Sequence, residues 1–212
     1  MATKIFNLII IDESGSMQHI KEEAINSVNE TIQTIRAAQK RNENQEHFVS
    51  IVSFNDDVKI INDRVAVDEV KELTEQSYQP DCCTALYDAI GLSLNALRKK
   101  VADKDKVLVT VVTDGYENAS REYSGKAIKA LVEELKEKGW VFAYIGANHD
   151  VEEVAASIAI ENTMRFEATD KGVAEMNYRV MACRSRWYDK IEMCDDDSKI
   201  SNRNFFKDDD DI

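Results

Sequence analysis

Residues 5–17 read IFNLIIIDESGSM, an apolar run that ends abruptly in an aspartate and a short polar loop. The run from Ile5 to Ile11 is apolar on both faces and is interrupted only by Asn7. Strands of this kind are typical of parallel sheets that helices cover on both sides. The stretch therefore predicts a buried strand whose carboxyl end presents Asp12 at the edge of the sheet where ligands bind.

Further apolar runs of strand length follow along the chain, and segments with helical periodicity separate them. We expect strands at 48–54, 107–112, 141–145 and 163–166, and helices at 20–41, 85–101, 126–138, 151–160 and 173–191. Residues 58–61 and 64–67 resemble a short pair of strands joined through Asn62 and Asp63 at an edge of the sheet. This order predicts an α/β fold, a doubly wound and mostly parallel central sheet flanked by helices on both faces.

The chain has 212 residues, and its 40 acidic against 27 basic side chains give a formal net charge of −13. No stripe of lysine and arginine is present, so nucleic acids and anionic membrane surfaces are poor candidates for partners. No apolar stretch reaches the roughly 18 residues that a membrane span needs. We predict one domain at residues 1–194, followed by an acidic tail at residues 195–212.

The predicted tail holds seven acidic and three basic residues, and it ends in the run from Asp208 to Asp211. Such a composition is typical of a mobile, solvated segment. The alternative is that Phe205 and Phe206 dock on the domain or on a basic partner. The four cysteines have no CxxC pair with zinc-finger spacing, which favours reduced thiols and a soluble, cytoplasmic protein. The oligomeric state is not indicated by the sequence.

Polar residues follow two of the predicted strands directly, at positions where the strands should be neighbours. Asp12 ends the first of these strands, and Asp114 follows the strand at 107–112. Two adjacent carboxylates repel each other unless a cation lies between them, and neither loop carries a basic side chain. Ser14 and Ser16 would add hydroxyl oxygens, and such all-oxygen ligation suits Mg²⁺, Mn²⁺ or Ca²⁺ rather than zinc or copper. The competing interpretation is that Asp12 and Ser14 only cap the following helix.

Three segments together resemble the metal-ion-dependent adhesion site, or MIDAS, of von Willebrand factor type A (vWA) domains. Residues 12–17, DESGSM, are similar to the family's DxSGSM motif; residues 82–86, CCTAL, correspond to GGTxL; and residues 113–115 are the family's TDG. The resemblance implies a vWA or Rossmann-like fold with hydroxyl ligands from Ser14, Ser16 and Thr84. It further implies that Asp12 and Asp114 bind the metal directly or through water. The expected cation is Mg²⁺ or Mn²⁺, ahead of Ca²⁺.

The resemblance implies a divalent-metal-dependent protein-binding module, for adhesion or as a scaffold, in which an Asp or Glu of a protein partner completes the coordination. We expect no enzymatic activity, because no nucleophile–base pair accompanies the oxygen ligands. Tyr116, Glu117 and Asn118 should lie on the rim and contact the partner. Cysteines stand where the family has two glycines, which supports the alternative of a vWA scaffold without a functional metal site. A phosphoaspartate phosphatase or receiver is a further alternative, but the phosphatases need a second aspartate where this chain has Ser14.

Overall fold

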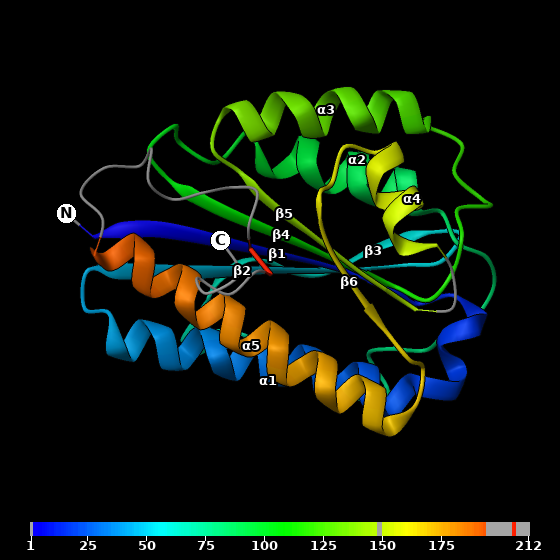
Figure 1. Cartoon of the computed structure of the whole chain (residues 1–212), viewed down its shortest axis with the longest axis horizontal. Helices are drawn as coiled ribbons and strands as arrows, with labels where there is room; N and C mark the ends of the chain where they lie inside the picture. The colour runs from blue at the N-terminus through cyan, green and yellow to red at the C-terminus, as the bar shows by residue number, and fades with distance from the viewer. Residues whose placement is uncertain (1, 148–149, 194–204, 207–212) are drawn as a thin grey trace.

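A computed structural model describes residues 2–147, 150–193 and 205–206 as a three-layer α/β structure (Figure 1). The strands are β1 (Thr3–Asp12), β2 (Gln45–Phe54), β3 (Val58–Ala66), β4 (Lys106–Thr113), β5 (Val141–Ala147) and β6 (Asn162–Phe166). The α-helices are α1 (Lys21–Arg41), α2 (Leu86–Leu97), α3 (Gly125–Glu137), α4 (Val151–Ser157) and α5 (Asp170–Met193), with short 3₁₀ helices η1 (Gly15–Ile20) and η2 (Val67–Glu69).

The six strands form one sheet in the order β3-β2-β1-β4-β5-β6. Every pair is parallel except β2 with β3, so the predicted doubly wound, mostly parallel sheet is confirmed. β1 and β4 are hydrogen-bonded neighbours at the centre, with Ile11 opposite Val112. The carboxyl ends of these two strands therefore meet at one edge of the sheet.

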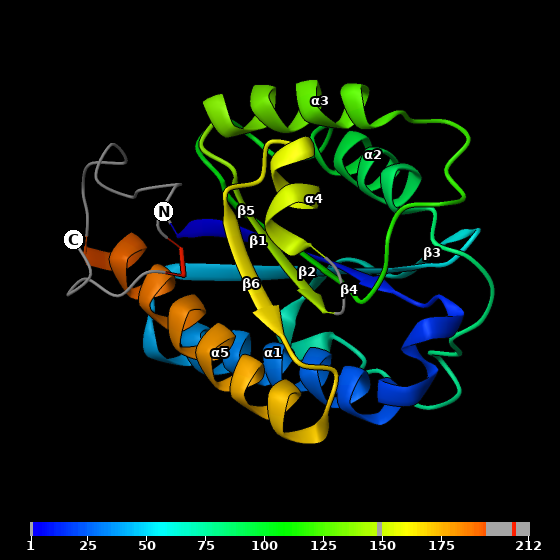
Figure 2. The same cartoon turned by 45° about the vertical axis from the view of Figure 1, so that its right-hand side comes forward.

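Helices α1 and α5 cover one face of the sheet, and α2, α3 and α4 cover the other (Figures 1 and 2). The alternation of β1 side chains explains why both faces are apolar. Ile5, Ile9 and Ile11 belong to the hydrophobic core under α1 and α5, whereas Leu8 and Ile10 belong to the core under α2 to α4. Each core is continuous, which is why the strands read as uninterrupted apolar runs.

Asn7 interrupts the first apolar run because it takes part in a buried polar network beneath α5. Its side-chain oxygen accepts hydrogen bonds from the hydroxyl of Tyr188 at 2.6 Å and from Arg184 Nη1 at 3.3 Å. Arg184 is 1% exposed, and its Nη2 also donates to the hydroxyl of Thr110 at 2.7 Å. Among the residues that the structure describes, this buried guanidinium has neutral hydrogen-bond partners and no carboxylate partner.

The segment after β2 differs from the sequence prediction. Instead of two short strands joined at Asn62 and Asp63, β3 is one strand of nine residues that pairs antiparallel with β2 at the edge of the sheet. The pairing register shifts between Val49 and Val52, and Arg64 has a positive φ of 51°. Polar residues that suggested a turn are therefore accommodated as a bulge, which bends a strand without ending it.

The predicted tail is described only at two residues, Phe205 and Phe206, and its other residues lie outside the described part of the chain. Phe205 is 6% exposed and belongs to the core under α1 and α5. Its backbone N–H donates to Asn162 Oδ1 at 3.0 Å, and the Phe206 ring lies against it with a centroid separation of 4.9 Å. The two phenylalanines thus pack on this domain, as in the docking alternative.

Candidate metal centre

The site residues predicted from sequence gather where β1 and β4 end. Asp12 is fully buried, and both of its carboxylate oxygens accept hydrogen bonds. Oδ1 accepts from the backbone N–H of Ser14 at 2.7 Å, and Oδ2 accepts from the hydroxyl of Thr113 at 2.5 Å. The pKa of Asp12 is raised from 3.8 to about 6: burial, the largest cause, and the charge of Asp114 raise it, whereas the hydrogen bonds from Thr113 and Ser14 lower it. Without a cation nearby, the buried carboxylate of Asp12 therefore carries an uncompensated electrostatic cost.

A chain of hydroxyl groups links Ser14 to Asp114. The hydroxyls of Ser14 and Ser16 lie 3.1 Å apart, and Ser16 Oγ donates to Asp114 Oδ1 at 2.5 Å. Asp114 is 5% exposed, and its second oxygen, Oδ2, is buried without a hydrogen-bond partner among the described residues. An orphaned carboxylate oxygen beside two hydroxyl groups is what a bound cation would satisfy.

The capping interpretation does not account for the hydroxyl of Ser14. Ser14 does occupy the N-cap position of η1, but its side chain makes no capping hydrogen bond. Its oxygen is directed to Ser16 instead. The backbone N–H of Ser14 is held by Asp12, so the loop is shaped without the serine hydroxyls. Those hydroxyls remain available as ligands.

Thr84 reaches the same place from the loop before α2. A β-carbon built on Gly115 would lie 3.8 Å from both Ser16 Oγ and Thr84 Oγ1, so the three residues surround one small space. The backbone of Thr84 is fixed on both sides by Asn118, whose Oδ1 accepts from Thr84 N–H at 2.9 Å and whose N–H donates to Thr84 C=O at 3.0 Å. The structure thus brings together all five predicted ligands.

The three residues predicted for the rim have different environments. Tyr116 is 56% exposed, and its hydroxyl accepts a hydrogen bond from the backbone of Asp150 at 3.2 Å. Glu117 is half-buried, and its carboxylate accepts from the backbone N–H groups of Tyr87 and Ser120, at 2.9 and 2.7 Å. Glu117 and Asn118 therefore position the loops, whereas Tyr116 presents an exposed ring. Partner contact stays a prediction for all three.

Several positioning residues were missed by sequence reasoning. The hydroxyl of Tyr78 donates to the backbone carbonyl of Asp12, and Glu13 accepts from the backbone of Gln79. Asp88, in α2, accepts from three consecutive backbone N–H groups at residues 121–123, at 2.7 to 2.9 Å. These side chains act on the backbones of distant loops, so no local pattern in the sequence signals them. Thr113 belongs to the TDG motif at residues 113–115, but the motif did not indicate that its hydroxyl donates to Asp12.

The cysteine pair in the loop before α2 is exposed, and neither thiol forms a disulfide. Cys82 adopts a φ of 61°, in the left-handed region that favours glycine. Its carbonyl accepts from Gly15 N–H at 3.2 Å, which ties this loop to the first motif. The carboxylates of Asp56 and Asp81 raise the pKa of the Cys82 thiol. The cysteines are compatible with the loop shape that the family builds with glycines, at the expense of backbone strain at Cys82.

We expect Cys82→Gly to stabilise the chain by up to about 1 kcal/mol, because relief of the left-handed conformation, about 1–2 kcal/mol, outweighs the added freedom of the unfolded chain, about 0.5–1 kcal/mol. Cys83 has no positive φ, so Cys83→Gly should instead destabilise by about 0.5–1 kcal/mol through the added freedom of the unfolded chain. Urea unfolding of both variants measures the difference. Equal effects of the two substitutions would show that Cys82 is not strained.

The donor set suits a hard cation. It comprises two carboxylates and three hydroxyls, all oxygen, with neither imidazole nor thiolate among the predicted ligands. Within the described ranges, no three or more His, Cys, Asp or Glu side chains cluster so that they could hold a metal ion by themselves. Any cation at this centre would thus depend on the serine and threonine hydroxyls as much as on the aspartates.

A mostly parallel sheet with helices on both faces and loops gathered over the carboxyl ends of β1 and β4 is a Rossmann-like α/β fold. The profile of the von Willebrand factor type A domain matches residues 8–178, so the chain belongs to the vWA family. Comparison with curated protein sequences found no match.

Solved structures share the fold at low sequence identity. A D319A mutant of the PilB minor pilin from Streptococcus sanguinis is 14% identical with a TM-score of 0.61, over 90% of this chain and 63% of the pilin. Proximal thread matrix protein 1 from the mussel byssus, with a zinc-occupied MIDAS motif, is 15% identical (TM-score 0.54; 87% of this chain, 46% of that one). The ArnB paralog VWA2 from Sulfolobus acidocaldarius is 16% identical (TM-score 0.55; 84% and 44%). This chain therefore spans between 44% and 63% of the length of these proteins.

No helix in the described part of the chain combines the length and the apolarity needed to cross a bilayer.

Proposed function

We propose that this vWA domain binds a divalent cation, Mg²⁺ or Mn²⁺, at a MIDAS-type site and uses it to engage an acidic residue of a protein partner. The observation that carries the proposal is the orphaned, buried Oδ2 of Asp114 next to linked serine hydroxyls. Ser14, Ser16 and Thr84 would supply hydroxyl ligands, and Asp12 and Asp114 the negative charge.

The site's charge explains why an acidic partner fits. Both oxygens of Asp12 already accept hydrogen bonds from the protein, so Asp12 would act on the metal largely through water. A cation with mostly neutral direct ligands keeps much of its positive charge and attracts a further carboxylate. When bound, the metal would add a positive charge beside the carboxylates of Asp12 and Asp114.

The alternatives receive less support. A vWA scaffold without a metal site would leave the buried Oδ2 of Asp114 without a partner, and an unsatisfied buried carboxylate oxygen is costly. A phosphoaspartate phosphatase would need a second aspartate at position 14 as its general acid and base. The chain has Ser14 there, and a serine hydroxyl does not exchange its proton readily enough at neutral pH to replace a carboxyl group. We therefore propose a binding function rather than an enzymatic one. The cytoplasmic location predicted from the sequence stays a prediction.

Mn²⁺ binding tests the proposal directly. Titration of the full chain with Mn²⁺, followed by the electron paramagnetic resonance signal of the free ion, should reveal one site per chain that Mg²⁺ displaces. Ser14→Ala and Thr84→Ala should each weaken binding at least about tenfold, since each removes an oxygen ligand. Ser157→Ala, a hydroxyl loss on α4, should leave binding unchanged. Unaltered Mn²⁺ affinity in both site variants would contradict the assignment of the ligands.

A second measurement addresses the acidic partner. If the bound Mn²⁺ keeps an open position, it should enhance water-proton relaxation, and glutarate should lower that enhancement by displacing the water. Glutaramide, the uncharged analogue, is the control and should have no effect. An enhancement that glutarate does not change, with Mn²⁺ still bound, would leave the metal site intact but refute carboxylate engagement.

A further inference from the structure

A groove lies between strand β3 and helix α2, at the edge of the sheet opposite to β6, and its cavity has a volume of about 270 Å³. Its base is apolar, because the buried side chains of Leu8, Val52 and Leu97 line it. Ile60 of β3 is 62% exposed, Leu92 of α2 is 38% exposed, and both also line the groove. The groove therefore presents an apolar surface that extends from the core to the solvent.

Small side chains leave this space open. Ser50 on β2, with Ser93 and Ala96 on α2, stand at positions that line the groove. Larger apolar residues would fill the space, as Ile90 and Leu94 do where α2 packs on the core beneath it. A bound molecule would supply the dispersion contacts that these small side chains leave unmade.

One polar group of the groove is unsatisfied. Ser93 is 8% exposed, and its hydroxyl is buried without a hydrogen-bond partner among the described residues. Other polar side chains of the groove are engaged: Ser50 Oγ accepts from the backbone N–H of Arg64 at 2.9 Å, and the amide of Asn62 donates to the carbonyl of Lys71 at 3.3 Å. Because an unpaired buried hydroxyl is costly, the site favours a ligand whose oxygen reaches Ser93.

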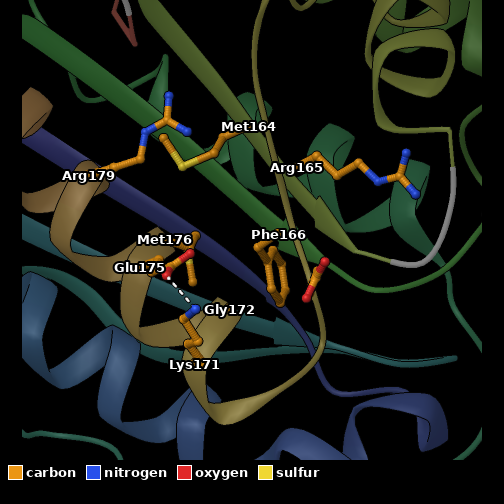
Figure 3. Close-up of a pocket in the computed structure, with 9 residues that line it drawn as sticks. Met164, Arg165, Phe166, Lys171, Gly172, Glu175, Met176 and Arg179 are labelled. Carbon is orange, nitrogen blue, oxygen red and sulfur yellow. Dashed lines mark ion pairs between the residues drawn. The ribbon is translucent and has the colours of Figure 1, made fainter.

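The charges at the groove favour a neutral occupant. Asp63 is the one charged residue among the described residues that line it, and its two carboxylate oxygens accept from Arg64 at 2.8 and 2.6 Å. A charged ligand would lose hydration on entering and gain no free counter-charge from the lining. The cavity between β6 and α5 differs in this respect: its volume is about 310 Å³, and charged side chains border it, with Lys171 3.6 Å from Glu175 (Figure 3).

The size of the groove indicates a small molecule rather than a protein surface. A cavity of about 150 Å³ holds one benzene molecule, so the groove, at about 270 Å³, admits roughly ten non-hydrogen atoms. A protein interface buries about 800 Å² on each side. Among the described residues that line the groove, the large exposed apolar side chains are Ile60 and Leu92, which is too few for such an interface.

We propose that this groove binds a neutral, mainly apolar small molecule of about ten non-hydrogen atoms, with one oxygen atom that forms a hydrogen bond with Ser93. The apolar part of the molecule would lie on the buried base of the groove and against Ile60 and Leu92. The residues that line the groove include none of the five proposed metal ligands, so the site is separate from the metal centre.

Methyl NMR of the full chain tests this site with 4-propylphenol, a phenol of the expected size that is uncharged at neutral pH. Titration should shift the methyl resonances of Leu8, Val52 and Leu92. Ser93→Ala should weaken the binding of 4-propylphenol about fivefold, because one hydrogen bond is lost. The same substitution should leave the affinity for propylbenzene, which lacks the oxygen, unchanged.

A second substitution tests the space rather than the hydrogen bond. Ala96→Leu should abolish the binding of both compounds, because leucine at this exposed position of α2 fills the groove. Ala130→Leu, the same change at an exposed position of α3, is the matched control and should leave both affinities unchanged. Thermal unfolding of each variant verifies that it is folded.

Each other outcome overturns the proposal in a recognisable way. Unshifted methyl resonances at the solubility limit of 4-propylphenol would mean that the groove takes up water only. Shifts confined to Met164 and Met176 would place the compound in the cavity of Figure 3. Equal affinity of the native chain and Ser93→Ala would refute the hydrogen bond. Shifts of Leu92 that depend on protein concentration without the compound would mean that a second copy covers the groove. None of these outcomes depends on whether the metal centre binds Mn²⁺.

Discussion

In EDTA at pH 7, the Asp12→Asn variant should unfold at a higher temperature than the native chain, and millimolar Mg²⁺ should stabilise only the native chain. A carboxyl whose pKa moves from 3.8 to about 6 costs the folded state up to about 3 kcal/mol at pH 7. Asparagine removes that cost and keeps the hydrogen bonds. Its Oδ1 can accept from Ser14 N–H, and its amide can donate to Thr113, whose hydroxyl then turns to Gly115 C=O, 3.3 Å away.

The same substitution should remove the response to metal. A ligand at 100 times its Kd stabilises a protein by about 2.7 kcal/mol, which for this chain length raises Tm by roughly 5–10 °C. We expect this rise for the native chain and none for Asp12→Asn, measured by calorimetry in EDTA and in Mg²⁺. Glu133→Gln on α3 loses one exposed charge and serves as the control. A metal response in Asp12→Asn equal to that of the native chain would refute the role of Asp12.

The pH dependence has a definite sign. The folded-state pKa of Asp12 lies above its unfolded value, so the unfolded chain loses this proton first as the pH rises. Without metal, the native chain should therefore lose stability relative to Asp12→Asn between about pH 4 and pH 6, and the difference should stay constant above that range.

Arg184→Ala should cost about 4 kcal/mol of unfolding free energy, whereas Arg184→Met should cost less than half as much. Alanine leaves a large cavity at a side chain that is 1% exposed, and it removes the donor to Thr110. Methionine fills most of that volume and also removes a buried charge that has no described carboxylate partner. Both substitutions also remove Arg184 Nε, which is buried and has no described hydrogen-bond partner.

Urea unfolding distinguishes packing from charge as the source of Arg184's contribution. Equal losses for alanine and methionine would mean that the hydrogen bonds to Asn7 and Thr110 dominate. Tyr188→Phe leaves the volume nearly unchanged and removes two hydrogen bonds, the one donated to Asn7 at 2.6 Å and the one accepted from Arg184 Nη1 at 3.3 Å, so it measures the hydrogen-bond contribution of the network alone, about 1–3 kcal/mol.

The fold could be predicted because its central strands β1, β4 and β5 are buried on both faces, so uninterrupted apolar runs mark them. The neighbouring positions of β1 and β4 followed from the α/β pattern, and with them the approach of Asp12 to Asp114. The β3 prediction failed because Asn62 and Asp63 are turn formers that the edge strand accommodates as a bulge. An edge strand such as β3 is largely exposed, so its sequence lacks the long apolar run that marks a central strand.

The candidate site was only partly predictable, and the reason is physical. Its proposed ligands lie within short motifs directly after strands, where spacing is informative. Asp88, Glu117 and Tyr78 act on backbone groups more than 25 positions away in the chain, and such bonds leave no periodic pattern. The burial of Phe205 was likewise undecidable, because a short aromatic pair in an acidic segment suits both a solvated and a docked state.

The carboxylates of Glu13, Asp88 and Glu117 order the loops of the site before any cation binds. They hold the loop backbones through hydrogen bonds that form when the chain folds, so the entropy of ordering these loops is lost at that stage and not when a cation arrives. The loops then serve as a rigid template, and the rate of cation capture would be governed by how fast the hydrated ion exchanges its water. Cation preference on such a template depends on the ligand atoms alone, which makes Ser16 and Thr84 positions where selectivity could be redesigned without rebuilding the fold.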